Sequence, residues 1–460
     1  MKKQLDPKDT ICRDLWAYPV IDLTRPRVRT CCKRHGEIIT DSKLKELGTD
    51  VFLNLTKTVD ERNQMMQGTQ VEGCKACWDL ENNGFRSFRS NELDWQYHFN
   101  NDKGTPVHYT KFRPYEELIK DTSDNILKSN MPNKLDIILG TYCDQKCIYC
   151  CSDFSTQWEV EDKKYGNIWG DPTTPKFKNI ISINNQTIEG WYEEFLNWFD
   201  NTYEYLERIA LLGGEPTYSP LFKPVSDHII EKLQTHAHPN CNLVIVTNLN
   251  WKQDVLDQII KLRLLLPASI KLTLEVSMES FEDRAEYIRH GVDWNLFTSN
   301  LEKISKIDNV EIVIVSTINA LCITSIKDFL EEIKKIEMKY DKNFRMIANR
   351  LIFPKWLSVN ILDKSFATYL TTTIQWIEQH YLGDALVYKK EMLNLLIEIS
   401  NNLNSDTELL GYFSKWIEEM DRRRLTNFIE TFPEYKNLFE NGKKYAKSLY
   451  TEQDIKKWSY

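Results

Sequence analysis

Three cysteines at fixed spacing constrain this chain more than any other feature. They are Cys143, Cys147 and Cys150, and they follow an apolar stretch at 135–139 that ends in Gly140. Cysteine thiolates are soft ligands that select iron–sulfur clusters or zinc. A structural site closes with four protein ligands, so a set of three leaves one metal position open for a substrate or cofactor. The sequence therefore predicts a strand followed by a loop that carries a metal centre with an open position.

The same residues resemble the radical S-adenosylmethionine (SAM) superfamily, in which an aromatic residue such as Tyr149 precedes the third cysteine. The resemblance implies that Cys143, Cys147 and Cys150 hold a 4Fe-4S cluster and that SAM occupies its fourth iron. In this family one electron from the cluster cleaves SAM, and the resulting 5'-deoxyadenosyl radical takes a hydrogen atom from the substrate. It also implies a low-potential electron donor such as flavodoxin or ferredoxin. Tyr149 counts here among the cofactor-binding residues.

Two other interpretations of these cysteines stay open. A zinc site needs a fourth ligand, and the nearest histidine, His108, lies far up the chain. The pair Cys147-Ile-Tyr-Cys150, taken alone, is also compatible with a thioredoxin-like redox motif after a strand. The downstream sequence favours the radical SAM interpretation over both.

A second motif, Gly213-Gly214-Glu215-Pro216, follows the strand-like residues 209–212. Two glycines let the backbone approach a ligand closely, because no Cβ stands in the way. Glu215 offers a carboxylate, and the proline stiffens the exit from the turn. In the radical SAM family the matching motif contacts the amino group of the methionine part of SAM, so the resemblance assigns Gly213, Gly214 and Glu215 to the cofactor.

Strand-like and helix-like stretches alternate from residue 187 to residue 352. Together with the stretch at 135 they make six strand–helix units, and the strands have the Val, Ile and Leu content of a buried parallel sheet. The sequence therefore predicts an α/β fold, a partial (βα)6 barrel of the TIM type. Ligands bind at the carboxyl ends of the strands in such folds, and both motifs fall at such ends.

Polar residues follow other strands of this series. We expect Asn248, Glu275 and Ser277 to line the same cavity, where a ribose needs hydrogen-bond partners. The resemblance implies that such strand ends contact the ribose and carboxylate of SAM. Arg289, or alternatively Arg284, is a candidate partner for a carboxylate of SAM or of the substrate. A solvated helix face is the other interpretation of these arginines.

Nine of the 11 cysteines lie between Cys12 and Cys151, which indicates metal binding rather than core filling. Besides the central three, the sequence offers Cys12, the pair at 31 and 32, and the spacing Cys74-x2-Cys77. These residues supply four ligands with one sulfur to spare, so a closed zinc site is a serious alternative to a cluster. Their surroundings resemble the auxiliary-cluster region of twitch or SPASM-type radical SAM proteins. The resemblance implies a second 4Fe-4S cluster at Cys12, Cys31, Cys74 and Cys77, with Cys32 as the alternate ligand.

The chain is expected to have three parts. Residues 1–133 form a cysteine-rich auxiliary cluster module and linker, 134–362 the barrel, and 363–460 a helical region that closes the open edge of the barrel. The long loop at 152–187 is a candidate lid, and Asp94, Trp95, His98 and His108 are weak candidates for a substrate cleft. The run Arg422 to Arg424 either binds an anion or forms a solvated helix face.

Composition narrows the function classes. A formal charge of −8, with 42% hydrophobic and 27% charged residues, is typical of a soluble globular protein and gives no global footprint for nucleic acid. The N-terminus lacks an apolar segment, and no run of about 18 apolar residues occurs, so we expect a cytoplasmic protein that neither spans nor anchors to a membrane. The substrate is expected to be a residue of a peptide or protein. The alternatives are a small metabolite, such as a nucleotide or sugar derivative, and a non-enzymatic, zinc-stapled binding protein.

Overall fold

A computed structural model of the chain describes residues 10–82, 87–89, 131–166, 190–236 and 241–449. The candidates Asp94, Trp95, His98 and His108 lie outside the described residues, as does most of the expected lid. Among the described residues, none of the helices has both the length and the apolar run needed to cross a membrane.

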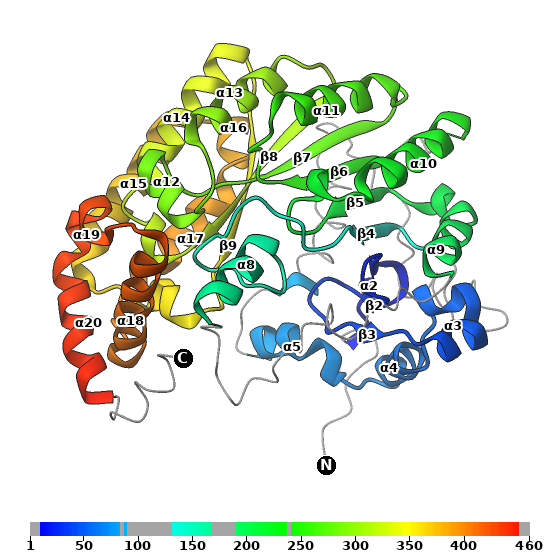
Figure 1. The fold of residues 1–460 in the computed structure, drawn as a ribbon, viewed down its shortest axis with the longest axis horizontal. Helices are drawn as coiled ribbons and strands as arrows, with labels where there is room; N and C mark the ends of the chain where they lie inside the picture. The colour runs from blue at the N-terminus through cyan, green and yellow to red at the C-terminus, as the bar shows by residue number, and fades with distance from the viewer. Residues whose placement is uncertain (1–9, 83–86, 90–130, 167–189, 237–240, 450–460) are drawn as a thin grey trace.

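A nine-stranded, mostly parallel sheet runs through the molecule (Figure 1). Its strand order is β3-β2-β1-β4-β5-β6-β7-β8-β9, and each strand from β4 to β9 pairs in parallel with the next. These six are the strands that the sequence predicted, because their apolar runs are long and regular. Their bounds are β4 (Lys134–Ile138), β5 (Arg208–Leu212), β6 (Asn242–Thr247), β7 (Lys271–Ser277), β8 (Val310–Ile318) and β9 (Arg345–Arg350).

Three N-terminal strands extend the sheet beyond β4, which the sequence did not predict. They are β1 (Pro19–Asp22), β2 (Arg27–Thr30) and β3 (Glu37–Ile38). β1 pairs in parallel with β4, and β2 then pairs antiparallel with β1. This covers the edge of β4, which would otherwise expose unpaired backbone groups. The N-terminal cysteine region is therefore continuous with the central sheet.

The two faces of the sheet differ in chemistry. One face is apolar and fully buried, as at Ile137, Leu211 and Leu274, and the connecting helices pack on this side (Figure 1). The alternate positions carry polar groups, including Asp136 on β4 and Glu275 on β7. The second face, called the polar face below, is thus the one able to offer charged groups to a ligand. The connecting helices are α9 (Trp191–Asp200), α10 (Phe222–Thr235), α11 (Gln253–Leu265), α12 (Glu282–Ile288), α13 (Trp294–Ser305) and α14 (Ile326–Tyr340).

The C-terminal helices close the β9 edge of the sheet, where the sequence predicted that they pack. The Met346 N–H donates to the Tyr388 carbonyl at 2.9 Å. Close by, Lys389 and Glu337 form a buried ion pair at 2.8 Å, which ties this region to α14. The helices are α15 (Ala367–His380), α16 (Asp384–Val387), α17 (Lys390–Asn401), α18 (Thr407–Arg424), α19 (Phe428–Thr431) and α20 (Lys436–Leu449). Short helices α2 (Asp14–Ala17), α3 (Asp41–Leu47), α4 (Thr56–Met66), α5 (Lys75–Asn82) and α8 (Thr156–Tyr165) complete the described chain.

Candidate functional site

The loop after β4, called the cysteine loop below (140–155), is held on one side by the Gly-Gly-Glu motif. The Gly214 N–H donates to the Gly140 carbonyl at 3.0 Å, and the Glu215 N–H donates to the Tyr142 carbonyl at 2.6 Å. A Cβ on Gly213 would lie 2.6 Å from the Gly140 oxygen, and one on Gly214 would lie 2.6 Å from the Tyr142 oxygen. Both glycines are therefore needed for the approach of the cysteine loop itself, whereas the sequence suggested only the approach of a ligand.

Residues after α12 hold the other side of the cysteine loop. The Lys146 N–H donates to the His290 carbonyl at 2.8 Å, and the Ile148 N–H donates to the Ile288 carbonyl at 2.7 Å. Gly291 has a φ of 108°, and a Cβ there would lie 2.8 Å from a carbonyl oxygen of the cysteine loop. The backbone of the loop is thus fixed between the ends of two distant segments before any metal is considered.

The three cysteines of the loop are half-buried, and they are near enough for their charges to act on one another. Burial raises the pKa of Cys143, Cys147 and Cys150, and the nearby Cys147 raises the pKa of the other two further. Thiols in such surroundings stay protonated unless a positive charge stabilises the thiolates. A bound metal supplies that charge, because metal binding deprotonates its cysteine ligands. The donor set therefore fits a thiolate-bound metal cluster.

Glu279, which the sequence analysis did not single out, brings two predicted site residues together. The Tyr149 hydroxyl donates to Glu279 Oε1 at 2.9 Å, and Arg289 Nη2 donates to Glu279 Oε2 at 2.6 Å. Arg289 Nη1 also lies 3.9 Å from Cys147 Sγ. Glu279 stands two residues after Ser277, the last residue of β7. A carboxylate that follows a strand end is the sequence signal that could have identified it as a site residue.

The Glu215 carboxylate is satisfied inside the fold. It accepts hydrogen bonds from the Thr217 hydroxyl at 2.7 Å, the Thr247 hydroxyl at 3.0 Å and the Asn248 N–H at 2.7 Å. Burial raises the pKa of Glu215 to about 7, against the effect of these donors. The side chain joins the ends of β5 and β6, and the predicted contact of the motif with SAM stays a prediction.

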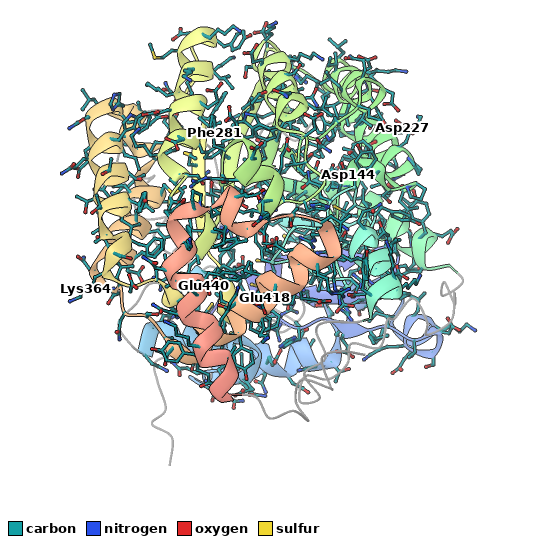
Figure 2. All side chains as sticks on the ribbon, turned by 60° about the vertical axis from the view of Figure 1, so that its left-hand side comes forward. Asp144, Asp227, Phe281, Lys364, Glu418 and Glu440 are labelled. Atoms are coloured by element: carbon teal, nitrogen blue, oxygen red, sulfur yellow. The ribbon has the colours of Figure 1, made fainter. Side chains whose placement is uncertain are left out.

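Asn248 lies at the end of β6, against the cysteine loop. Its side-chain amide donates to Asp144 Oδ1, and the Asn250 amide donates to Asp144 Oδ2, each at 2.7 Å. In Figure 2 Asp144 lies to the right of helices α18 and α20, which carry Glu418 and Glu440. Asn248 thus holds the cysteine loop, a role beyond the ribose contact expected from the sequence.

Glu275 takes part in a hydrogen-bonded chain across the polar face. Arg208 donates to Glu275 Oε1 at 3.3 Å and to Asp136 Oδ1 at 2.5 Å. The Tyr18 hydroxyl donates to Asp136 Oδ2 at 2.6 Å. Ser277 lies two residues further along β7 and is half-buried. This series of hydrogen bonds connects the N-terminal segment to the central strands.

The N-terminal cysteines gather around one small cavity. Its lining includes all four predicted ligands, Cys12, Cys31, Cys74 and Cys77. Cys32 is absent from the lining; a hydrogen bond from Cys31 lowers its pKa, and Asp136 and Tyr18 also act on this thiol. Cys31 has a positive φ of 71°, which is rare for a residue with a side chain. The structure thus turns Cys31 toward the cavity and Cys32 toward the polar face.

The C-terminal helix α18 supports the cysteine loop through α8. Arg424 lies 3.4 Å from Glu161, and both side chains are almost completely buried. Glu161 also pairs with Lys146 of the loop. The Arg424 guanidinium lies 4.8 Å from the centre of the Trp158 ring, and the Trp158 indole N–H donates to the Cys147 carbonyl at 2.8 Å.

The sequence offered two interpretations of the run Arg422 to Arg424 at the end of α18, an anion-binding site or a solvated helix face. Both are wrong for Arg423 and Arg424. Only Arg422 is exposed, and it pairs with Glu419 on the same helix. Arg423 is buried, donates to the Gly166 carbonyl at 2.7 Å and lies 3.3 Å from Asp162. The acidic partners sit on α8, far away in the sequence, so no local pattern could reveal them. Similarly, Arg284 donates to Glu434 at 2.6 Å and fastens α12 to the C-terminal region.

No protein-family model and no curated protein match the chain. Solved structures do, among them anSMEcpe with bound AdoMet, at 16% identity and a TM-score of 0.32 over 60% of this chain and 64% of that chain. The chain thus spans less than two thirds of anSMEcpe. A second match is anSMEcpe with AdoMet and the Cp18Cys peptide, at 14% identity and a TM-score of 0.29, over 58% of this chain and 60% of that chain.

SuiB from Streptococcus suis matches 88% of this chain and 78% of its own, at 14% identity and a TM-score of 0.34. At these identities any account of activity rests on the residues described above. Both anSMEcpe structures contain bound AdoMet, which is S-adenosylmethionine.

Proposed function

We propose that the chain is a radical SAM enzyme, with a 4Fe-4S cluster held by Cys143, Cys147 and Cys150. One observation carries the proposal: the two motifs, far apart in the sequence, meet. The Gly-Gly-Glu backbone holds the loop that bears the three half-buried cysteines, through the hydrogen bonds from Gly214 and Glu215. The loops after β4 and β5 adjoin because the two strands are neighbours in the sheet, and the support lies in how closely they fit, since a Cβ on Gly213 or Gly214 would lie 2.6 Å from a carbonyl oxygen of the cysteine loop.

The proposed SAM site lies where the cysteine loop meets the ends of β5, β6 and β7. Its proposed residues are Tyr149, Gly213, Gly214, Glu215, Asn248, Glu275, Ser277 and Arg289. When bound, the cluster and SAM supply an electron and a 5'-deoxyadenosyl radical. Arg289 offers a positive charge 3.9 Å from the Cys147 sulfur. Glu279 positions that guanidinium and the Tyr149 ring together.

The six parallel strands are proposed to curve into a partial (βα)6 barrel around the polar face. The support is the contrast between the faces, because helices cover one face and charged side chains occupy the other. A flat sheet in water has no need to concentrate Asp136, Arg208 and Glu275 in one hydrogen-bonded chain on one side.

An auxiliary 4Fe-4S cluster is proposed at Cys12, Cys31, Cys74 and Cys77. These cysteines surround a cavity that Arg34 and Arg89 also line, so positive charge is available to offset four thiolates. A closed zinc site is the alternative for the same four ligands.

The proposed substrate is a residue of a peptide or protein. The polar face continues across the sheet from Arg27 on β2 to Arg345 on β9, well beyond the strands that would hold SAM. Such a surface suits an extended ligand. The alternatives remain a small metabolite and, outside enzymes, a zinc-stapled binding protein. A low-potential flavodoxin or ferredoxin is the proposed electron donor.

The test is SAM cleavage by the anaerobically reconstituted chain under dithionite, compared with the triple variant Cys143→Ala/Cys147→Ala/Cys150→Ala. We expect the wild type to form 5'-deoxyadenosine and the triple variant to form none. Cys151→Ala is the matched control, because it removes a neighbouring thiol outside the motif, and it should keep activity. A wild type that forms no 5'-deoxyadenosine, or a triple variant that still forms it, would refute the proposed function.

A further inference from the structure

Two arginines on β2 have buried guanidinium nitrogens without partners. The Nε atoms of Arg27 and Arg29 are shielded from solvent, and neither has a hydrogen-bond partner in the part of the chain that the structure describes. Their neighbour Arg25 differs, because its Nε donates to Asp22 Oδ2 at 2.8 Å. A buried donor without a partner is costly and rare in proteins, so it calls for an explanation such as a ligand.

The strand register directs both arginines onto the polar face. Arg29 lies opposite Val20, and Val20 lies beside Asp136, which accepts hydrogen bonds from Tyr18 and Arg208 on that face. Arg27 lies opposite Asp22, which is already paired with Arg25. The side chains of Arg27 and Arg29 are half-buried, so a ligand can reach them.

Gly36 makes room for the Arg27 side chain. A Cβ on Gly36 would lie 2.5 Å from both Cγ and Cδ of Arg27. The backbone at Gly36 does not adopt a positive φ, so the missing side chain matters for space rather than for conformation. The fold therefore accommodates an arginine at a place where it forms no ion pair within the described chain.

Positive charges repel one another here. Burial lowers the pKa of Arg27, Arg25 and Arg29 lower it further, and Asp22 and Asp153 raise it in part. A bound anion would offset both the desolvation and the repulsion. Arg27 and Arg29 stand two residues apart on the same face of a strand, which places two planar forks side by side, and this geometry suits carboxylate and phosphate oxygens.

The position of the pair relates it to both cysteine sites. β2 leads directly into Cys31, and Arg34, whose Nε is also buried without a partner, lines the N-terminal cysteine cavity. On the other side, the charges of Arg25 and Arg27 act on Asp153 of the cysteine loop and lower its pKa against the effect of burial.

We propose that Arg27 and Arg29 form an anion-binding subsite between the two cysteine sites, which takes a carboxylate or phosphate group of the substrate. That the bound anion belongs to the substrate depends on the proposed function, whereas the existence of an anion-binding site does not. A carboxylate would come from an acidic side chain or the C-terminus of a peptide, and a phosphate from a phosphorylated metabolite.

Calorimetric titration of the reconstituted full chain tests the subsite, with a short oligoglutamate peptide, a neutral serine–glycine peptide and inorganic phosphate as probes. We expect oligoglutamate or phosphate to bind saturably and the neutral peptide not to bind. Arg27→Gln and Arg29→Gln should each weaken anion binding roughly tenfold or more, the range of hydrogen bonds to charged groups. Arg422→Gln removes an exposed arginine from α18 and should leave the affinity unchanged.

Gly36→Ala provides a second variant that keeps every charge. Its added Cβ must displace the Arg27 side chain, so the variant should also weaken anion binding. This variant still tests the subsite if Arg27→Gln does not fold. A wild type that binds no anion saturably, or anion binding that all three variants leave unchanged, would overturn the proposal. SAM cleavage is measured separately, so a chain that binds anions but forms no 5'-deoxyadenosine refutes the proposed function and not the subsite.

Discussion

At the scale of single residues, the site depends on charged groups that are buried in pairs. Glu279 accepts from both Tyr149 and Arg289, and Arg289 in turn reaches the Cys147 sulfur at 3.9 Å. The type and rough position of Tyr149 and Arg289 were accessible from the sequence, because they stand in or near recognisable motifs. Their common partner, Glu279, was not accessible, because acidic residues commonly follow strands and only the fold shows that this one contacts both.

Arg289→Gln should make the midpoint potential of the three-cysteine cluster more negative by several tens of millivolts. A positive charge near a cluster favours its reduced form, and the variant removes that charge. Potentiometric titration followed by electron paramagnetic resonance (EPR) measures the effect, and Arg289→Lys should restore part of it. Arg284→Gln is the control, since Arg284 pairs with Glu434 elsewhere. Equal potentials in wild type and Arg289→Gln would contradict the assigned role.

Glu215 predicts a pH dependence of stability. Its pKa is raised by burial to about 7, above the usual value for a glutamate. The folded state therefore holds a proton that the unfolded state has released between about pH 4.5 and 7, so stability decreases as the pH rises through this window. Urea unfolding of the full chain at several pH values should show this slope, and Glu215→Gln should flatten it. A variant with the same slope as the wild type would show that other groups cause it.

At the scale of elements, the cysteine loop is clamped by segments far apart in the sequence. The ends of β5 and α12 grip its backbone, while α18 supports it through α8. The six central strands could be predicted because each carries its own apolar pattern. The contacts that hold the cysteine loop could not be predicted, because Glu161 and Arg424 look like surface residues of charged helices in the sequence. Only the packing of α8 against α18 shows that they pair.

Arg424→Ala should destabilise the loop and speed the loss of iron to a chelator. Among the described residues, the change leaves Glu161 buried with Lys146 as its remaining ion-pair partner, and it removes the guanidinium from the Trp158 ring. Breaking a buried ion pair costs about 3 kcal/mol. Chelator challenge and thermal unfolding measure the two effects. Arg422→Ala, on the same helix but exposed, should change neither. The clamp would be disproved if both variants lost iron at the wild-type rate.

At the scale of the whole molecule, one sheet includes both the strand that precedes Cys31 and the strand that precedes the cysteine loop. The sequence predicted two metal regions in separate parts of the chain, because their cysteines are far apart along it. In the structure β1 pairs with β4, and the chain Tyr18–Asp136–Arg208–Glu275 runs from the N-terminal segment across the central strands. Short strands rich in arginine, such as β2, give little apolar signal, so their place in the sheet was invisible to pattern analysis.

The proposed function requires a cluster at Cys143, Cys147 and Cys150 with an open iron that binds SAM, and a closed site at the N-terminal cysteines. The most direct measurement is the EPR spectrum of the reduced Cys74→Ala/Cys77→Ala variant, which should retain only the central cluster, with and without SAM. SAM should change the spectrum of this variant and should cause no such change in the variant that lacks Cys143, Cys147 and Cys150. A spectrum of the retained central cluster that is unaffected by saturating SAM would contradict the proposed function.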